Sequence, residues 1–308
     1  MFIRVLLIAA FISAPLQGQR VFPGGPAFPF SDSAIVITLG TGTPVPNPER
    51  SGPATAVVVG RRVFLFDAGA GVMRRVAAAG LPIDGVTAAF ISHLHSDHTL
   101  GLPDLMLTSW VMGRSAPMAI HGPPGLKRMT DHVLAAWAED TVVRVQGLER
   151  GRPGGYRVDA RETRGGVVFD SGGVKVTAIR VPHGEWEYAF AYRVDALGRR
   201  IVISGDTRPC ENLVRWSTDV DCLIHECTEM TKTSWYPECG WPTIEAKIRD
   251  LQSYHTAPHE IGRIAREARA RRLVISHLMP HSVPEELAAA AAAHYAGEVV
   301  VGEDLMDV

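Results

Sequence analysis

The stretch His93-Leu94-His95-Ser96-Asp97-His98 places three imidazoles and one carboxylate within six residues. The segment before it, residues 85–92, is apolar and ends in a serine, which predicts a buried strand. The motif then lies on a loop at a strand end, where the sheet fixes its side chains. Imidazole and carboxylate groups are the ligands of catalytic zinc sites, which keep one position open for water. A polar loop without a metal is the alternative, but it would crowd these groups with no cation to hold them together.

Three later residues stand in a similar setting. His183, Asp206 and His277 each follow an apolar run, over residues 174–181, 201–204 and 273–276 respectively. Each one alone would more often be an ordinary structural residue. Because all three follow strand-like runs, together they indicate that separate strands deliver ligands to one edge of a sheet.

This pattern resembles the metallo-β-lactamase superfamily, in the branch of tRNase Z and of arylsulfatase- and phosphodiesterase-like proteins, from about Ala34 to the C-terminus. The resemblance implies an α/β (α+β) fold, a four-layer αββα sandwich with metals at one edge. It assigns one Zn²⁺ to His93, His95 and His183, a second Zn²⁺ to Asp97, His98 and His277, and a bridging role to Asp206. Two zinc ions activate water as a nucleophile near neutral pH, and Asp97 would accept its proton.

Two further motifs are similar to those of tRNase Z. Residues 224–228 resemble its H-E-A-T motif with Cys227 in place of alanine, and His255-Thr256 resembles its H-S-T motif. The resemblance implies that His255 protonates the leaving group and that Glu226 orients His255. The alternative for His255 is a residue at the start of a helix. Asp67 resembles a residue of the family that orients metal ligands by hydrogen bonds without binding the metal itself. The alternative is that Asp67 begins a helix.

The N-terminal segment differs from the rest of the chain. Residues 5–14 are apolar, follow Arg4, and are too few to span a bilayer. We interpret residues 1–20 as a signal peptide, 21–33 as a Pro/Gly/Phe-rich linker and 34–308 as the hydrolase domain, which predicts a periplasmic or secreted protein. A hydrophobic first strand is the alternative.

Charge and cysteine content restrict the partners and the cross-links. The net charge is −2 and the chain has no basic run, so no nucleic-acid partner is expected. No membrane partner is expected after signal removal, and a homodimer is possible.

Four cysteines fall in one segment: Cys210, Cys222, Cys227 and Cys239. They permit two disulfides or four buried thiols.

The remaining pattern predicts alternating strands and helices. Strands are expected at 34–39, 54–59, 62–66, 118–121, 188–194, 200–204 and 220–226, and helices at 71–79, 102–110, 125–138, 211–217, 242–252, 259–270 and 285–295. Residues 151–173 are rich in Gly and Arg and read as turns.

The spacing between two expected ligands bears on the substrate. His183 and Asp206 are 206 − 183 = 23 positions apart, which leaves no room for the tRNA-gripping arm that tRNase Z carries there. We therefore expect an exported dinuclear zinc hydrolase that cleaves a small phosphodiester or an aryl sulfate. The alternatives are a β-lactamase or lactonase, a tRNase Z-type endoribonuclease without the arm, and a metal-binding scaffold without activity.

Overall fold

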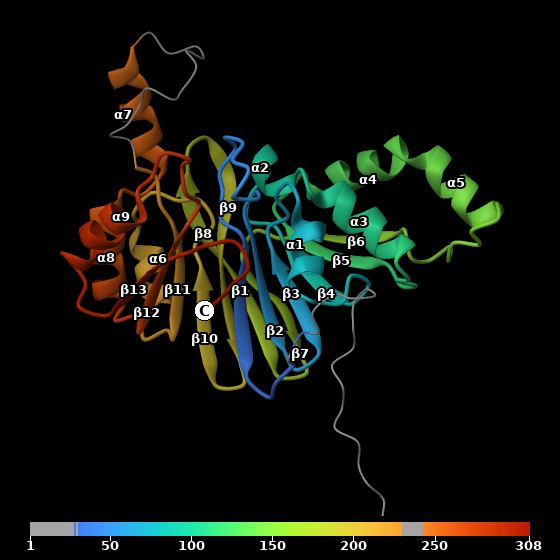
Figure 1. Ribbon diagram of the computed structural model, residues 1–308, viewed down its shortest axis with the longest axis horizontal. Helices are drawn as coiled ribbons and strands as arrows, with labels where there is room; N and C mark the ends of the chain where they lie inside the picture. Colours follow the sequence, from blue (N-terminus) through green and yellow to red (C-terminus); the bar gives the residue numbers. More distant parts are fainter. Residues whose placement is uncertain (1–27, 29, 230–242) are drawn as a thin grey trace, which may run out of the picture.

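The computed structural model describes residues 28, 30–229 and 243–308 (Figure 1). Within them the strands form two seven-stranded sheets, and helices cover the outer faces. The αββα sandwich expected from the sequence is confirmed. No helix in the described ranges combines the length and the apolar character that crossing a membrane requires.

The first sheet belongs mostly to the N-terminal half. Its order is β14 (Met306–Asp307), β1 (Ala34–Gly40), β2 (Ala54–Val59), β3 (Arg62–Phe66), β4 (Val86–Phe90), β5 (Met118–Gly122) and β6 (Val158–Glu162). The pairs from β14 to β3 are antiparallel, and those from β3 to β6 are parallel.

The second sheet repeats this arrangement. Its order is β7 (Gly166–Ser171), β8 (Val174–His183), β9 (Trp186–Ala196), β10 (Arg199–Ile203), β11 (Cys222–Glu226), β12 (Arg272–Ser276) and β13 (Glu298–Val301). The pairs from β7 to β10 are antiparallel, and those from β10 to β13 are parallel. Strands β8, β10, β11 and β12 therefore run in one direction and end at the same edge.

The described helices connect these strands. They are α1 (Val72–Ala78), α2 (Ser96–Thr99), α3 (Leu102–Val111), α4 (Leu126–Ala136), α5 (Ala138–Gln146), α6 (Glu211–Trp216), α7 (Ile244–Tyr254), α8 (Pro258–Glu267) and α9 (Pro284–Ala292). Helices α1 and α3 pack on the first sheet, while α6, α8 and α9 pack on the second. Helices α4 and α5 project to one side of the sandwich, and α7 stands beyond the edge where β8 and β9 meet (Figure 1).

Strand alternation divides the buried residues into three clusters, as four layers require. Along β3, Val63 and Leu65 face the helices, whereas Phe64 and Phe66 face the other sheet. Because successive side chains of a strand point to opposite faces, an apolar residue at every position buries both faces. This pattern is typical of strands buried on both sides.

Contacts between the sheets hold the loop that follows β4. The hydroxyl of Tyr192, on β9, donates a hydrogen bond of 2.8 Å to the carbonyl of Ile91. The backbone N–H of Phe190 donates to the carbonyl of Ser92 at 3.0 Å. Both acceptors lie directly before His93, so the second sheet fixes the start of the histidine-rich loop.

Most of the expected elements are confirmed, and two expectations are wrong. Residues 151–173 are not only turns, because they contain the exposed strands β6 and β7. The single helix expected at 125–138 is shorter and is followed by a second helix, α5. The proposed signal peptide lies outside the described residues, and so does most of the linker. At the end of the linker, Phe28 is buried against the first cluster.

Replacing Phe90 by alanine tests the packing between the sheets. The ring is fully buried and stacks on Phe66 and His121, with ring centroids 5.0 Å apart in both pairs. We expect the free energy of unfolding in urea to fall by about 3–5 kcal/mol, because a large core side chain leaves a cavity. Val167→Ala on exposed β7 is the control. A loss below about 1 kcal/mol would contradict this account of the core.

Candidate metal centre

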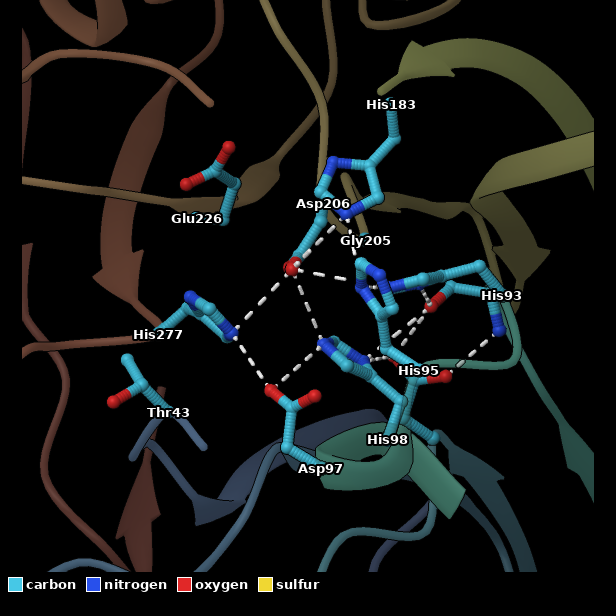
Figure 2. A network of polar contacts seen from close by, with 12 residues as sticks. Thr43, His93, His95, Asp97, His98, His183, Gly205, Asp206, Glu226 and His277 are labelled. Atoms are coloured by element: carbon cyan, nitrogen blue, oxygen red, sulfur yellow. Dashed lines mark hydrogen bonds and ion pairs between the residues drawn. The ribbon is translucent and has the colours of Figure 1, made fainter. Parts of the chain in front are cut away.

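Strand ends bring seven side chains together at one edge of the sandwich (Figure 2). Those of the first motif follow β4, either in the loop or in the short helix α2. His183 ends β8, Asp206 follows β10, and His277 follows β12. The structure thus places all seven residues that the sequence proposed as ligands in one cluster: His93, His95, Asp97, His98, His183, Asp206 and His277.

The first group of donor atoms comprises three histidine nitrogens and one carboxylate oxygen. Nδ1 of His95 lies 2.8 Å from Nε2 of His93 and 3.2 Å from Nε2 of His183. Oδ2 of Asp206 lies 3.9 Å from the His93 nitrogen and 3.8 Å from that of His183.

The second group shares the same oxygen of Asp206. Nε2 of His98 lies 3.3 Å from it, and Nε2 of His277 lies 3.4 Å from it. Oδ2 of Asp97 lies 3.5 Å from the His98 nitrogen and 3.3 Å from the His277 nitrogen. Asp206 therefore belongs to both groups, as a bridging residue would.

The spacing of these donors fits metal ions. Tetrahedral zinc with bonds of about 2.0–2.1 Å separates its ligand atoms by about 3.3 Å, close to the distances in the second group. Nε2 of His98, one of these donor atoms, is buried without a hydrogen-bond partner. Buried polar atoms normally have partners, so this nitrogen is free to coordinate a metal ion.

Burial also keeps the histidines of the first group neutral, which is the form that binds metals. Burial and the neighbouring His98 place the pKa of His93 well below its ordinary value. Burial and His183 lower the pKa of His95 to about 4. Burial likewise lowers the pKa of His183.

Asp67 positions the second group from behind. Its Oδ2 accepts a hydrogen bond from Nδ1 of His98 at 2.8 Å, which leaves Nε2 directed at the cluster. Its Oδ1 accepts from the backbone N–H of Ser92 at 2.7 Å. The residue has φ 60°, a left-handed conformation that aspartate tolerates better than most residues. The expectation that Asp67 orients a ligand agrees with these contacts, and α1 begins five residues later.

Local backbone features place Asp206 and His277. Gly205, with φ 57°, passes so close to the neighbouring strand β9 that a Cβ atom there would lie 2.6 Å from the carbonyl oxygen of Phe190. Only glycine fits such a close approach. His277 itself has φ 58°, and the next residue, Leu278, donates its N–H to the carbonyl of Thr41 at 2.7 Å.

His255 and Glu226 form a buried pair beside the donor groups. Nδ1 of His255 lies 3.1 Å from Oε1 of Glu226, which also accepts the backbone N–H groups of Thr207 and Thr256. Burial alone would lower the pKa of His255, but the charge and hydrogen bond of Glu226 outweigh burial and raise it. The His255 ring lies 5.7 Å from that of His277, centroid to centroid.

Several contacts at the site were not assigned from sequence. The indole N–H of Trp186 points at Nε2 of His95 at 2.9 Å. The carbonyl of Tyr254 lies 3.0 Å from Nδ1 of His183, and the hydroxyl of Ser92 lies 3.0 Å from Nδ1 of His93. Trp186 follows His183 by three residues, and Ser92 directly precedes His93. This closeness in sequence to proposed ligands is the signal from which Trp186 and Ser92 could have been predicted to lie at the site.

The cysteines do not cross-link where the structure describes them. Cys210, Cys222 and Cys227 are free, and the last two are buried. This agrees with the buried-thiol alternative for those two residues. Cys239 lies outside the described residues, as do the aromatic residues of the segment 230–242.

Comparisons with known proteins identify the family of the chain. Residues 62–278 match the β-lactamase superfamily domain. The chain is 32% identical over 279 residues to a protein named ribonuclease Z from Mycobacterium bovis, covering 88% of this chain and 96% of that protein. The chain belongs to the β-lactamase superfamily, within the ribonuclease Z family.

Solved structures show the same fold. Human tRNase Z, short form, has a TM-score of 0.65 at 25% identity, covering 89% of this chain and 98% of that one. The metallo-β-lactamase fold protein YhfI from Bacillus subtilis has a TM-score of 0.68 at 19% identity, covering 90% and 99%. The second likeness concerns the fold alone.

These relatives correct one expectation. A low net charge without basic runs predicted that nucleic acid is not a partner. That prediction is wrong, because proteins named ribonuclease Z align with the chain over nearly their whole length. Net charge summed over a chain averages over all its faces, so it does not describe the field at one edge.

Asp67→Asn tests the support of the second donor group. Asparagine keeps an oxygen for the N–H of Ser92 but removes the charge that faces Nδ1 of His98. We expect zinc affinity, measured by competition with a chelator, to fall about 10- to 100-fold. Asp131→Asn, an exposed aspartate on α4, is the control. Unchanged affinity in Asp67→Asn would remove the positioning role.

Proposed function

We infer that the chain is a metal-dependent phosphodiester hydrolase of the ribonuclease Z type, acting on RNA. The observation that carries this proposal is the His255–Glu226 pair, which lies against a donor cluster built for metal. A ribose oxygen is a poor leaving group, so its departure calls for a positioned acid. Sequence relatives named ribonuclease Z support the same assignment.

The donor groups would hold two zinc ions. We assign His93, His95 and His183 to one ion, Asp97, His98 and His277 to the other, and Asp206 to both. Zinc bound there supplies an activated water near neutral pH and polarises the scissile ester. Histidine and carboxylate donors suit zinc better than they suit magnesium or calcium, which prefer oxygen ligands.

The protein's own residues would move the protons. Burial alone would raise the pKa of Asp97, but the hydrogen bond from His277 and the charge of His98 lower it, so the carboxylate stays ionised and can accept a proton. His255 holds its proton because Glu226 raises its pKa. Glu226 occupies Nδ1, which leaves Nε2 of His255 to donate to the leaving oxygen.

A small phosphodiester or an aryl sulfate is the second candidate substrate. Between His183 and Asp206 the structure has only β9, β10 and the turn at Leu197-Gly198, with no projecting arm. This short connection supports a substrate that needs no large gripping surface. Export of the protein, and with it a periplasmic or secreted location, stays a proposal that rests on residues 1–20.

Metal removal tests the cluster. We expect the purified protein to hold two zinc ions per chain by elemental analysis, and a chelator to abolish hydrolysis that added zinc restores. Asp206→Ala should lose both ions, because its oxygen faces both groups. One retained zinc in Asp206→Ala, with unchanged affinity, would contradict the shared-ligand assignment.

His255→Ala tests the proton donor. We expect cleavage of an RNA substrate with a 3′ extension to slow by about 10²- to 10⁴-fold. Bis(p-nitrophenyl) phosphate should lose less than about tenfold, since nitrophenolate leaves without a proton. His132→Ala, on the exposed face of α4, is the control. Equal losses on both substrates, at unchanged zinc content, would remove His255 from this role.

A panel of substrates separates the alternatives. A wild-type enzyme that cleaves the RNA and the nitrophenyl diester, but not a β-lactam, a lactone or p-nitrophenyl sulfate, is the expected result. Cleavage of the small diester without RNA would favour the second candidate. Zinc binding with no turnover on any substrate would favour a metal-binding scaffold.

A further inference from the structure

Leu100 is an exposed leucine only two residues after His98. Its relative exposure is 63%, although neighbouring Thr99 is buried. Single exposed apolar residues are common and need no explanation. Leu100, however, lines a pocket of about 670 Å³ that is also lined by Asp97, a proposed zinc ligand. That volume lies within the usual range for small-molecule sites.

Three prolines also line this pocket. Pro44, Pro46 and Pro48 are all exposed in the loop that follows β1, and half-buried Val45 lies between the first two. Proline rings are rigid and apolar, and the fixed φ of proline limits what the loop can do. The pocket therefore offers a preformed apolar surface next to the metal cluster.

A buried carboxylate holds this loop in place. Oδ1 of Asp304 accepts the backbone N–H and the hydroxyl of Thr41 at 2.9 and 2.8 Å. Oδ2 accepts the N–H of Ser51 at 2.7 Å, and Arg75 approaches it at 3.2 Å. Both ends of the proline-rich loop are thus anchored to one side chain, which is the support that a binding site requires.

The charges in the pocket do not suit a phosphate. Arg50 is the only cationic residue among the lining residues, all of which are described. One of its terminal nitrogens, Nη1, is committed to the hydroxyl of Thr41 at 2.6 Å and to the carbonyl of Gly302 at 2.7 Å. Asp97 adds negative charge. An uncharged, apolar group fits these walls better than a phosphate does.

One lining residue of the pocket shows how the pocket lies relative to the cluster. In Figure 2 Thr43 is drawn on the side of His277 and Asp97, opposite to the side on which His93 and His95 are drawn. Glu226, the partner of His255, lies on the other side of His277 in the same view. A group in this pocket therefore belongs to the part of the ester that His255 does not protonate.

We propose that the pocket between Leu100 and the prolines of residues 44–48 binds an aromatic ring on the non-leaving side of the scissile phosphodiester. The proposal rests on the proposed function. The ring is either a nucleobase or a simple aryl group, since both present flat faces to apolar walls. The pocket would thus select diesters with an aromatic group on that side over diesters with a small alkyl group there.

The test compares three diesters that share p-nitrophenolate as the leaving group. Their other arms are p-nitrophenyl, thymidine and methyl. In Leu100→Asn the ratio of kcat/KM for an aromatic arm to that for methyl should fall about 3- to 10-fold, mainly through KM, the factor expected for one lost apolar contact. Leu148→Asn, a fully exposed leucine after α5, is the control and should leave the ratio unchanged.

A fall of this ratio in Leu100→Asn, for both aromatic diesters or for one of them, supports the pocket and identifies the ring that it binds. An unchanged ratio on both, or the same fall in Leu148→Asn, overturns the proposal. Calorimetric affinities of the zinc-loaded protein for phenylphosphonate and methylphosphonate give a reading that needs no turnover. Leu100→Asn should weaken phenylphosphonate alone by a similar factor. If no diester is cleaved, the proposed function fails, while these affinities still decide the pocket.

Discussion

One carboxylate oxygen connects the two halves of the metal centre. Oδ2 of Asp206 lies 3.3–3.9 Å from nitrogens of four histidines: His93, His98, His183 and His277. Burial alone would raise the pKa of this carboxyl, but the charges of His277 and His98 hold it well below its usual range. A buried charge of this kind needs compensation. Cations in either donor group would stabilise the same oxygen, which makes the two groups one site.

The architecture explains how residues far apart in sequence reach this oxygen. In the second sheet β8, β10 and β12 run in the same direction, so His183, Asp206 and His277 leave at one edge. The loop after β4 reaches that edge from the first sheet, and Tyr192 and Phe190 tie it down across the interface. Packing between the sheets and geometry at the metal centre are therefore coupled.

The sequence predicted the parts of this protein that depend on local patterns. Apolar runs followed by His183, Asp206 and His277 predicted both the strands and the convergence of their ends, because parallel strands end together. The exposed strands β6 and β7 were missed, since their alternation is weak and the segment contains many glycines and arginines. The hydrogen bonds of Asp304 could not be predicted from sequence patterns either, because they join residues more than 250 positions apart. The nucleic-acid prediction failed because overall charge carries no information on position.

Two residues of the site, Asp67 and His277, have left-handed backbones that glycine would adopt with less strain. Asparagine, whose short side chain can form local hydrogen bonds, also adopts that conformation as a single residue. Selection for thermal resistance alone would therefore favour replacing His277, at the expense of the metal centre. This trade-off between stability and activity implies that consensus-style stabilisation of this enzyme should leave Asp67 and His277 unchanged.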